Sequence, residues 1–406
     1  MENINKNRLF LAACISLVVT AMTFAIRAGI LSQLGVDFGL SDRELGFVNS
    51  MAFFGFPIAT IFGGLVYNSL GPKKLMLIAF ISHLVGLVMT IYAGGFWTLL
   101  ISTFFIGFAN GSVEAACNPM ITDMYTTNRT TMLNKFHVWF PGGIVIGALV
   151  SKFMTDAAMS WQMQIGVMII PTILYGILFF RQKFPTSENI VSNTQENAKA
   201  LLSPLFIFMV LCMTLTATTE LGTQQWVEKI LGNSGAHPML ILAMITGLMA
   251  VGRFFAGPVI HTLSPPKVLW VSSIISVLAI YLMSISTGNM VYFSAVLFAV
   301  GVMYFWPTMI GFIAEYVPKT GALGMSIIGG AGMFATGIWQ PVIGSWLDDA
   351  RSEALASGVA EEAAELVAGQ ATLGKIVYFP IVLVVCFSVL LVMRKKVEAG
   401  RVAQDH

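Results

Sequence analysis

The sequence predicts an all-α membrane protein whose twelve transmembrane helices form two pseudo-symmetric six-helix bundles. The chain has 406 residues, is 56% apolar and 10% charged, and has a mean hydropathy of +0.81, whereas soluble domains carry about 25% charged residues. Crossing about 30 Å of hydrocarbon takes roughly 20 helical residues. Twelve apolar runs meet this requirement, at residues 9–31, 46–67, 75–94, 97–120, 136–156, 161–181, 202–226, 238–262, 267–287, 290–314, 322–346 and 372–394.

A polar break after the sixth run divides these helices into six and six. Residues 182–200 contain Pro185 and several Ser and Asn residues, a composition typical of a flexible linker. We therefore expect an N-terminal bundle over residues 1–181, a cytoplasmic linker over 182–200 and a C-terminal bundle over 201–406.

The two halves also repeat weakly. The loop after the second run reads Gly64-Leu-Val-Tyr-Asn-Ser-Leu-Gly-Pro-Lys-Lys, and it corresponds to Gly257-Pro-Val-Ile-His-Thr-Leu-Ser-Pro-Pro-Lys after the eighth run. Internal symmetry of this kind is typical of secondary transporters, in which the substrate site lies at the interface of the repeats near mid-membrane.

Basic residues are distributed unequally between the two sides of the predicted membrane. Fifteen Lys and Arg residues lie on the side that carries both termini, and five lie on the other side. By the positive-inside rule, both termini are expected to be cytoplasmic. The first run has no small-x-small cleavage site behind it, so we interpret it as an uncleaved first helix.

Glu114 is an acid within the apolar run 97–120, and an acid inside a membrane marks a substrate or ion pathway by default. Asn110 and Asn118 lie four residues before and after it, so the three side chains are expected on one helical face that points to a central cavity. We expect Glu114 to bind a coupling proton and to contact substrate, with Asn110 and Asn118 also in the substrate site. The alternative is a permanent structural ion pair with Arg27.

Arg27 is a cation inside the first apolar run. It could be a counter-ion that sets the charge state of Glu114, or its planar guanidinium could hold a carboxylate or phosphate group of a substrate. The sequence leaves both roles open, together with purely structural pairing.

Further candidate substrate contacts lie in the later helices. Glu220, Gln224 and Gln225 offer acceptors and amide donors around one turn, which suits the hydroxyl groups of a sugar. The adjacent Trp226 could stack on a sugar ring or anchor the helix at the membrane interface. The remaining candidates are His137, Trp306 and Gln340.

Each of these remaining candidates has a structural alternative. His137, at the cytoplasmic start of the fifth helix, could relay a proton or satisfy a helix end, and Trp306 could be a packing residue. Arg253, near the inner end of the eighth helix, is expected to extend to the interface or to pair with a loop acid. Gly107 and Gly111 have the spacing of close helix packing.

The sequence carries no enzymatic constellation. It lacks a Gly-rich phosphate loop, a His-Glu-x-x-His pair and a Ser-His-Asp order, so no enzyme activity, metal site or cofactor is predicted. No basic stripe follows a nucleic acid backbone, which excludes nucleic acid as a partner. Without an ATP site, uphill transport would have to draw on an ion gradient.

The twelve helices, the central linker and the loop at residues 64–74 resemble the major facilitator superfamily. Within it, Glu114-Ala-Ala-Cys-Asn118-Pro119, Leu133-Asn134-Lys-Phe-His137 and Phe305-Trp306-Pro307-Thr308 are similar to the fucose permease branch of sugar:cation symporters. This resemblance implies that Glu114 couples a proton and contacts the sugar. Asn68, His261 and Arg27 depart from the pattern, since the superfamily usually has an acid at the first two and the fucose permease has one in helix one.

We therefore expect a sugar symporter, driven by protons, that works by alternating access. The resemblance further implies a monomer in a bacterial inner membrane, with the lipid bilayer and a small-molecule substrate as partners. One alternative is an organic anion or sugar-acid transporter that uses Arg27. Others are sodium coupling, because carboxylate and amide oxygens suit a hard cation, and a nutrient sensor or scaffold built on the same fold.

Overall fold

The computed structural model describes residues 4–125, 129–185, 200–255 and 263–393, and within these ranges it contains helices and no strand. In this described part of the chain, eleven helices are long and apolar enough to cross a membrane, and Pro238–Phe254 adds a shorter apolar helix. These twelve segments are consistent with the twelve predicted spans. The predicted fold class, an all-α membrane protein, is confirmed.

The backbone divides into two compact units. The predicted linker falls largely on residues 186–199, which lie outside the described residues, so the domain boundaries at 181 and 201 stay a prediction. Unit 1 comprises Met1–Ile190, Pro238–Thr246 and Gln340–Ser345, and unit 2 comprises Val191–His237, Gly247–Trp339 and Trp346–His406.

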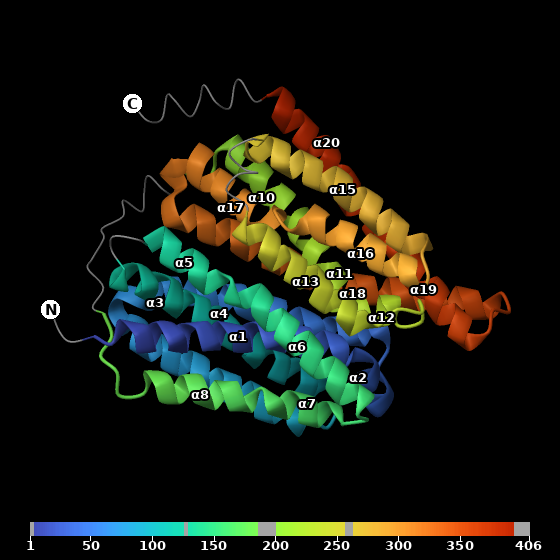
Figure 1. Ribbon diagram of the computed structural model, residues 1–406, viewed down its shortest axis with the longest axis horizontal. Helices are drawn as coiled ribbons and strands as arrows, with labels where there is room; N and C mark the ends of the chain where they lie inside the picture. Colours follow the sequence, from blue (N-terminus) through green and yellow to red (C-terminus); the bar gives the residue numbers. More distant parts are fainter. Residues whose placement is uncertain (1–3, 126–128, 186–199, 256–262, 394–406) are drawn as a thin grey trace. The chain divides into compact units, whose positions relative to one another are not determined.

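Unit 1 is built around two sets of packed helices (Figure 1). Helix α1 (Lys6–Gly29) packs against α6 (Trp139–Asp156) and α8 (Ile169–Phe179), while α3 (Asp42–Ile91) packs along α4 (Phe96–Met124). The shorter helices of this unit are α2 (Leu31–Phe38), α5 (Arg129–His137) and α7 (Trp161–Val167).

Helix α3 contains two membrane spans separated by a sharp break. It begins at a capping box formed by Ser41 and Glu44. Gly71 then adopts φ 73° and ψ 162°, a left-handed conformation that glycine reaches without a Cβ clash. Pro72 follows and has no backbone N–H for a helical hydrogen bond. One long helical segment can therefore supply both spans.

The α3 and α4 backbones approach closely at two glycines. A Cβ at Gly107 would lie 2.3 Å from the carbonyl oxygen of Ala52, and one at Gly111 would lie 2.2 Å from that of Phe56. Side-chain rearrangement cannot relieve such overlaps because the opposing atoms belong to the backbone. These distances support the interpretation of this glycine spacing as a helix-packing motif.

We expect Gly111→Ala to lower the melting temperature of the purified protein, since its methyl group would force α3 and α4 apart. Overpacking of this kind costs about 1–3 kcal/mol. The matched control is Gly142→Ala in α6, where nothing lies within 4 Å of an added Cβ. Equal melting temperatures for the two variants would show that close packing is not what Gly111 provides.

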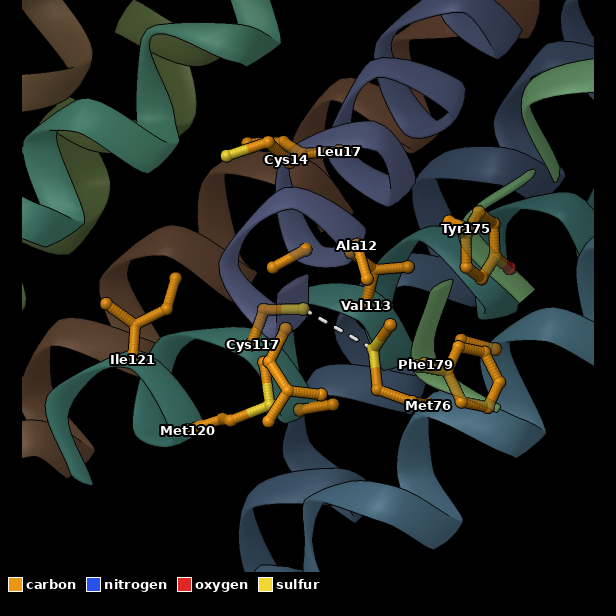
Figure 2. Packing of buried hydrophobic residues seen from close by; sticks show 14 of the residues in the cluster. Ala12, Cys14, Leu17, Met76, Val113, Cys117, Met120, Ile121, Tyr175 and Phe179 are labelled. Atoms are coloured by element: carbon orange, nitrogen blue, oxygen red, sulfur yellow. Dashed lines mark hydrogen bonds between the residues drawn. The ribbon is translucent and has the colours of Figure 1, made fainter. Parts of the chain in front are cut away.

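Aliphatic, aromatic and sulfur-containing side chains fill the interior of unit 1 between α1, α3, α4 and α8 (Figure 2). The Cys117 Sγ lies 3.4 Å from the Met76 Sδ. On α4, Val113 and Cys117 belong to this core. Glu114 and Asn118 each follow one of these core residues, which places them about 100° further round the helix. Both side chains are therefore only partly buried, at the edge of the packed face.

Unit 2 contains several short helical segments. A single polypeptide run forms α10 (Pro204–Ala217), the π-helix η1 (Thr218–Gly222), α11 (Thr223–Gln225) and α12 (Val227–Leu231). Its other elements are α15 (Pro265–Ile285), α16 (Asn289–Val302), α17 (Phe305–Tyr316), the 3₁₀ turn η2 (Pro318–Thr320), α19 (Glu361–Ile376) and α20 (Tyr378–Val392), together with parts of α13 (Pro238–Phe254) and α18 (Gly321–Ala356).

Three of the predicted spans in unit 2 are interrupted. The run predicted at 202–226 is divided by the π-helical turn η1, the run predicted at 290–314 is divided between α16 and α17, and the run predicted at 372–394 is divided between α19 and α20. The second break has a local cause. Pro307 has no N–H, so it cannot donate the helical hydrogen bond to the carbonyl of Met303, four residues earlier.

Candidate functional site

A carboxyl, an amide and an imidazole meet in unit 1, and we call them the Glu114 cluster. The Oε2 of Glu114 accepts a hydrogen bond of 2.7 Å from the Nδ2 of Asn118. The Oδ1 of Asn118 lies 3.1 Å from the Nε2 of His137. The Nδ1 of His137 lies 4.0 Å from the Oε1 of Glu114. The structure thus brings together three of the residues singled out in the sequence.

The geometry of the cluster allows a proton on either of two groups. Because the Asn118 Nδ2 donates to Glu114, its Oδ1 is an acceptor, and the Nε2 of His137 must donate to it. The Nδ1 of His137 then faces the carboxyl with a lone pair or a proton. At 4.0 Å this contact is an ion-pair distance and not a hydrogen bond. The cluster can carry a proton on Glu114 or on His137.

Exposure differs strongly between these two groups. The side chain of Glu114 is 14% exposed, and that of His137 is 45% exposed. A proton arriving at the surface of the unit would therefore meet the imidazole before the carboxyl.

Arg27 lies in a separate part of unit 1 and is almost completely buried. Its guanidinium carbon lies 5.1 Å from the centroid of the Phe24 ring. The residue lines a cavity of about 20 Å³ together with Thr23, Thr90 and Thr103, which is room for about one water molecule. Within the described ranges, the ion-pair partner of Glu114 is His137 and not Arg27.

Asn110 belongs to a directional chain of hydrogen bonds that is fully buried. The Tyr175 hydroxyl lies 2.9 Å from the Nδ1 of His83, whose Nε2 lies 2.8 Å from the Oδ1 of Asn110. The Nδ2 of Asn110 donates to the Thr23 hydroxyl over 3.0 Å, and that hydroxyl donates to the carbonyl of Thr20. The chain connects α8, α3, α4 and α1.

This chain separates Asn110 from the Glu114 cluster. Four residues turn an α-helix by 400°, so a row of i, i+4 residues drifts by about 40° per step. The drift carries Asn110 into the interior of the bundle, where its exposed fraction is 0%. The predicted contact of Asn110 with substrate stays a prediction, and both polar atoms of its amide already have partners.

Unit 2 holds a buried acid, Glu220. Glu220 lies in the π-helical turn η1, and its Oε1 accepts a bond of 3.0 Å from the Nη2 of Arg253. The Nε of Arg253 also donates to the carbonyl of Met303 over 2.8 Å. Arg253 was expected to extend to the interface or to pair with a loop acid, and the structure pairs it with Glu220, an acid of a helical turn, and with a main-chain carbonyl.

The other predicted contacts of unit 2 lie close along the same run. Gln224 and Gln225 are each 4% exposed, and the Nε2 of Gln224 lies 3.6 Å from the Met249 Sδ. Trp226 is completely buried, so it is not an anchor at the membrane interface. Trp306, in α17, is partly buried.

Gln340 of α18 is completely buried, and neither polar atom of its amide has a hydrogen-bond partner among the described residues. An amide in that state is costly unless it binds something in another state of the protein. Its predicted contact with substrate stays a prediction.

The helical membrane fold, the partly buried Glu114 and the buried Glu220 define a multi-pass membrane protein of the transporter class. The chain belongs to the Major Facilitator Superfamily, whose family model matches residues 13–222. The more specific resemblance to the fucose permease branch stays a prediction.

The curated relatives are transporters of several solute classes. The chain is 20% identical over 363 residues to the sialic acid transporter NanX of Escherichia coli (strain K12), covering 84% of this chain and 87% of that protein. It is also 20% identical over 209 residues to myo-inositol transporter 1 of Candida albicans. That match covers 50% of this chain but spans only 38% of the relative's length. A match to the cis,cis-muconate transport protein of Acinetobacter baylyi likewise spans 41% of the relative.

Solved structures share the fold at low sequence identity. A bacterial homologue of the human lysosomal transporter Spinster, inward-facing and unoccupied, has a TM-score of 0.75 at 14% identity and covers 95% of this chain and 97% of its own. A D-xylose-proton symporter has a TM-score of 0.73 at 13% identity, with coverage of 92% and 96%. At these identities the likeness shows the fold alone.

Proposed function

We propose that this protein is a proton-coupled sugar symporter that works by alternating access. The Glu114 cluster carries this proposal, because it places a partly buried carboxyl beside an imidazole within a membrane-spanning bundle. As part of the same proposal, the protein acts as a monomer in a bacterial inner membrane with both termini on the cytoplasmic side.

The partners of Glu114 favour proton coupling over a permanent ion pair. A neighbouring Lys or Arg would hold the carboxylate charged in every state, whereas an imidazole exists in both a neutral and a charged form. A proton on Glu114 would neutralise a charge that is costly to move through a closed state. Binding both proton and solute would then permit the transition that binding of either one alone disfavours.

Hydroxyl-bearing solutes fit the polar groups of unit 2. Glu220, Gln224 and Gln225 combine carboxylate and amide groups in one buried turn, and neighbouring hydroxyls can bond to both. Trp306 and Gln340 are proposed as further contacts. Relatives named for myo-inositol and for glucose support a sugar or polyol as the solute.

A sugar acid is the second candidate, and a specific observation favours it. The sialic acid transporter matches this chain over 84% of its length, far more than the myo-inositol transporter does. In this reading Arg27 would hold the carboxylate of the solute. Arg27 is 5% exposed in this structure, so it would have to become accessible in another state.

Thermal stabilisation of the purified protein tests the proposed solute class. The panel contains L-fucose, D-xylose, myo-inositol and sialic acid, each at pH 5.5 and 7.5, with and without sodium. We expect at least one neutral compound to raise the melting temperature without sodium, because solutes that bind only the folded state stabilise it. Stabilisation by sialic acid alone would replace the sugar proposal with the sugar-acid one, and a sodium requirement would contradict proton coupling.

A further inference from the structure

Three threonine hydroxyls line the helical run that leads through the π-helical turn of Glu220. The π-helical turn disturbs the usual α-helical hydrogen bonding in this region. Each hydroxyl donates to the main-chain carbonyl four residues earlier. These bonds run from Thr218 to Thr214 over 2.7 Å, from Thr219 to Leu215 over 2.7 Å and from Thr223 to Thr219 over 2.8 Å. The bulge that carries Glu220 is therefore stabilised by its own sequence.

The break between α16 and α17 exchanges hydrogen bonds with the end of α13. The carbonyl of Met303, which Pro307 cannot reach with an N–H, accepts from the Nε of Arg253 over 2.8 Å. In return, the Tyr304 hydroxyl donates to the carbonyl of Gly252 over 3.1 Å. Arg253 thus has one edge of its guanidinium fixed by backbone geometry.

Arg253 binds only one of the two oxygens of the Glu220 carboxylate. The Nη2 of Arg253 bonds to the Oε1 of Glu220 over 3.0 Å. The Oε2 has no hydrogen-bond partner among the described residues, and the Glu220 side chain is 6% exposed. A buried carboxylate oxygen without a donor is energetically costly. This oxygen is therefore an acceptor in unit 2 that would gain from a donor supplied by a ligand.

We propose that Arg253 is a positioning residue that holds Glu220 so that its Oε2 accepts a hydrogen bond from a hydroxyl group of the transported solute. This inference rests on the proposed function and deepens it. The ion pair has no net charge, so the group that meets it is a neutral hydrogen-bond donor. A solute carboxylate at this point would face the Oε2 with like charge and without a proton to share.

Glu220→Gln tests the solute contact. The amide retains one oxygen for Arg253 but replaces the second acceptor with an NH₂ group, which cannot accept from a hydroxyl. For each panel compound that stabilises the wild type, the Kd is measured by titrating the melting temperature. We expect the Kd to rise about tenfold or more, as for the loss of a hydrogen bond to a charged group, while proton-driven accumulation persists at saturating solute.

The exposed residue Glu362 supplies the matched control, since Glu362→Gln makes the same chemical change at an exposed position of α19. An unchanged Kd in Glu220→Gln would overturn the proposed contact. Loss of accumulation with unchanged Kd would also overturn it, because that result assigns Glu220 to coupling.

A double-mutant cycle tests the role of Arg253 independently, with melting temperatures measured in the absence of solute. Arg253→Lys retains the charge but has no planar fork with which to serve the Met303 carbonyl and Glu220 together. Pro307→Ala supplies an N–H for that carbonyl. We therefore expect Arg253→Lys to lower the melting temperature less in the Pro307→Ala background than in the wild type. Additive losses would overturn the carbonyl contact.

The solute titration and the double-mutant cycle can fail independently of each other. If no compound of the panel stabilises the wild type, the sugar proposal and the solute contact at Oε2 are both overturned. The double-mutant cycle tests the contact of Arg253 with the Met303 carbonyl whatever the panel shows. A merely structural ion pair would change melting temperatures in Arg253→Lys without changing the Kd for solute. For a positioning residue we expect Arg253→Lys to raise the Kd as well.

Discussion

Glu114→Gln is expected to abolish uphill uptake while leaving exchange of solute between two pools. The amide is nearly isosteric with the carboxyl, and its oxygen can still accept from the Nδ2 of Asn118. It cannot gain or lose a proton at any accessible pH. A carrier that binds solute in the normal way but carries no proton equilibrates the solute and does not accumulate it.

Proteoliposomes with an imposed pH gradient measure this effect directly. At one proton per solute, a gradient of one pH unit can support about a tenfold accumulation, because both correspond to about 1.4 kcal/mol. The wild type should approach that ratio, and Glu114→Gln should remain near unity. Counterflow, in which unlabelled solute inside drives labelled solute inward, should be retained in the variant.

The control for this experiment is again Glu362→Gln, which removes an exposed acid from α19. Uphill uptake that survives in Glu114→Gln would move proton coupling away from the Glu114 cluster. Loss of counterflow together with accumulation would instead indicate that Glu114 is needed to bind the solute. Only the selective loss of accumulation supports the proposed role.

The membrane spans were predictable from the sequence because their signal is local. An apolar run of about 20 residues between polar loops leaves the backbone no alternative to a helix. The interruptions within some of those runs were only partly predictable. Pro307 indicates a break and an orphaned carbonyl, but the donor that satisfies the carbonyl is Arg253, 50 residues earlier in the chain. That contact depends on packing, which periodicity does not report.

In the candidate site too, contacts within one helix were predictable from the sequence and contacts between helices were not. Asn118 lies four residues from Glu114 on one helix, so their contact follows from helical geometry. The contacts of Asn110 do not, since its partners lie on α1 and α3. The role of His83 was not predicted, although an ionisable residue inside the predicted run 75–94 is a signal that could have identified it.

Asn110→Ala is expected to lower stability strongly and to leave solute affinity unchanged. The substitution removes both bonds of the amide, which leaves the Nε2 of His83 without an acceptor and the Thr23 hydroxyl without its donor. Both groups are buried in unit 1. The orphaned imidazole N–H costs about 1–3 kcal/mol, and the Thr23 hydroxyl, which still donates to the carbonyl of Thr20, loses one bond worth about 1 kcal/mol, so the expected loss is about 2–4 kcal/mol.

Melting temperature and Kd, measured on the same preparation, distinguish a structural Asn110 from a substrate-binding one. The control is Asn289→Ala, which changes an exposed residue at the start of α16 and should shift the melting temperature little. A large fall in melting temperature with an unchanged Kd would assign Asn110 to the helix-connecting chain. A normal melting temperature with a raised Kd would show that Asn110 contacts the solute in another state, as its place on the helix of Glu114 predicts. In that case the hydrogen bonds from His83 and to Thr23 would have to break during transport, and the chain would be part of the transport cycle.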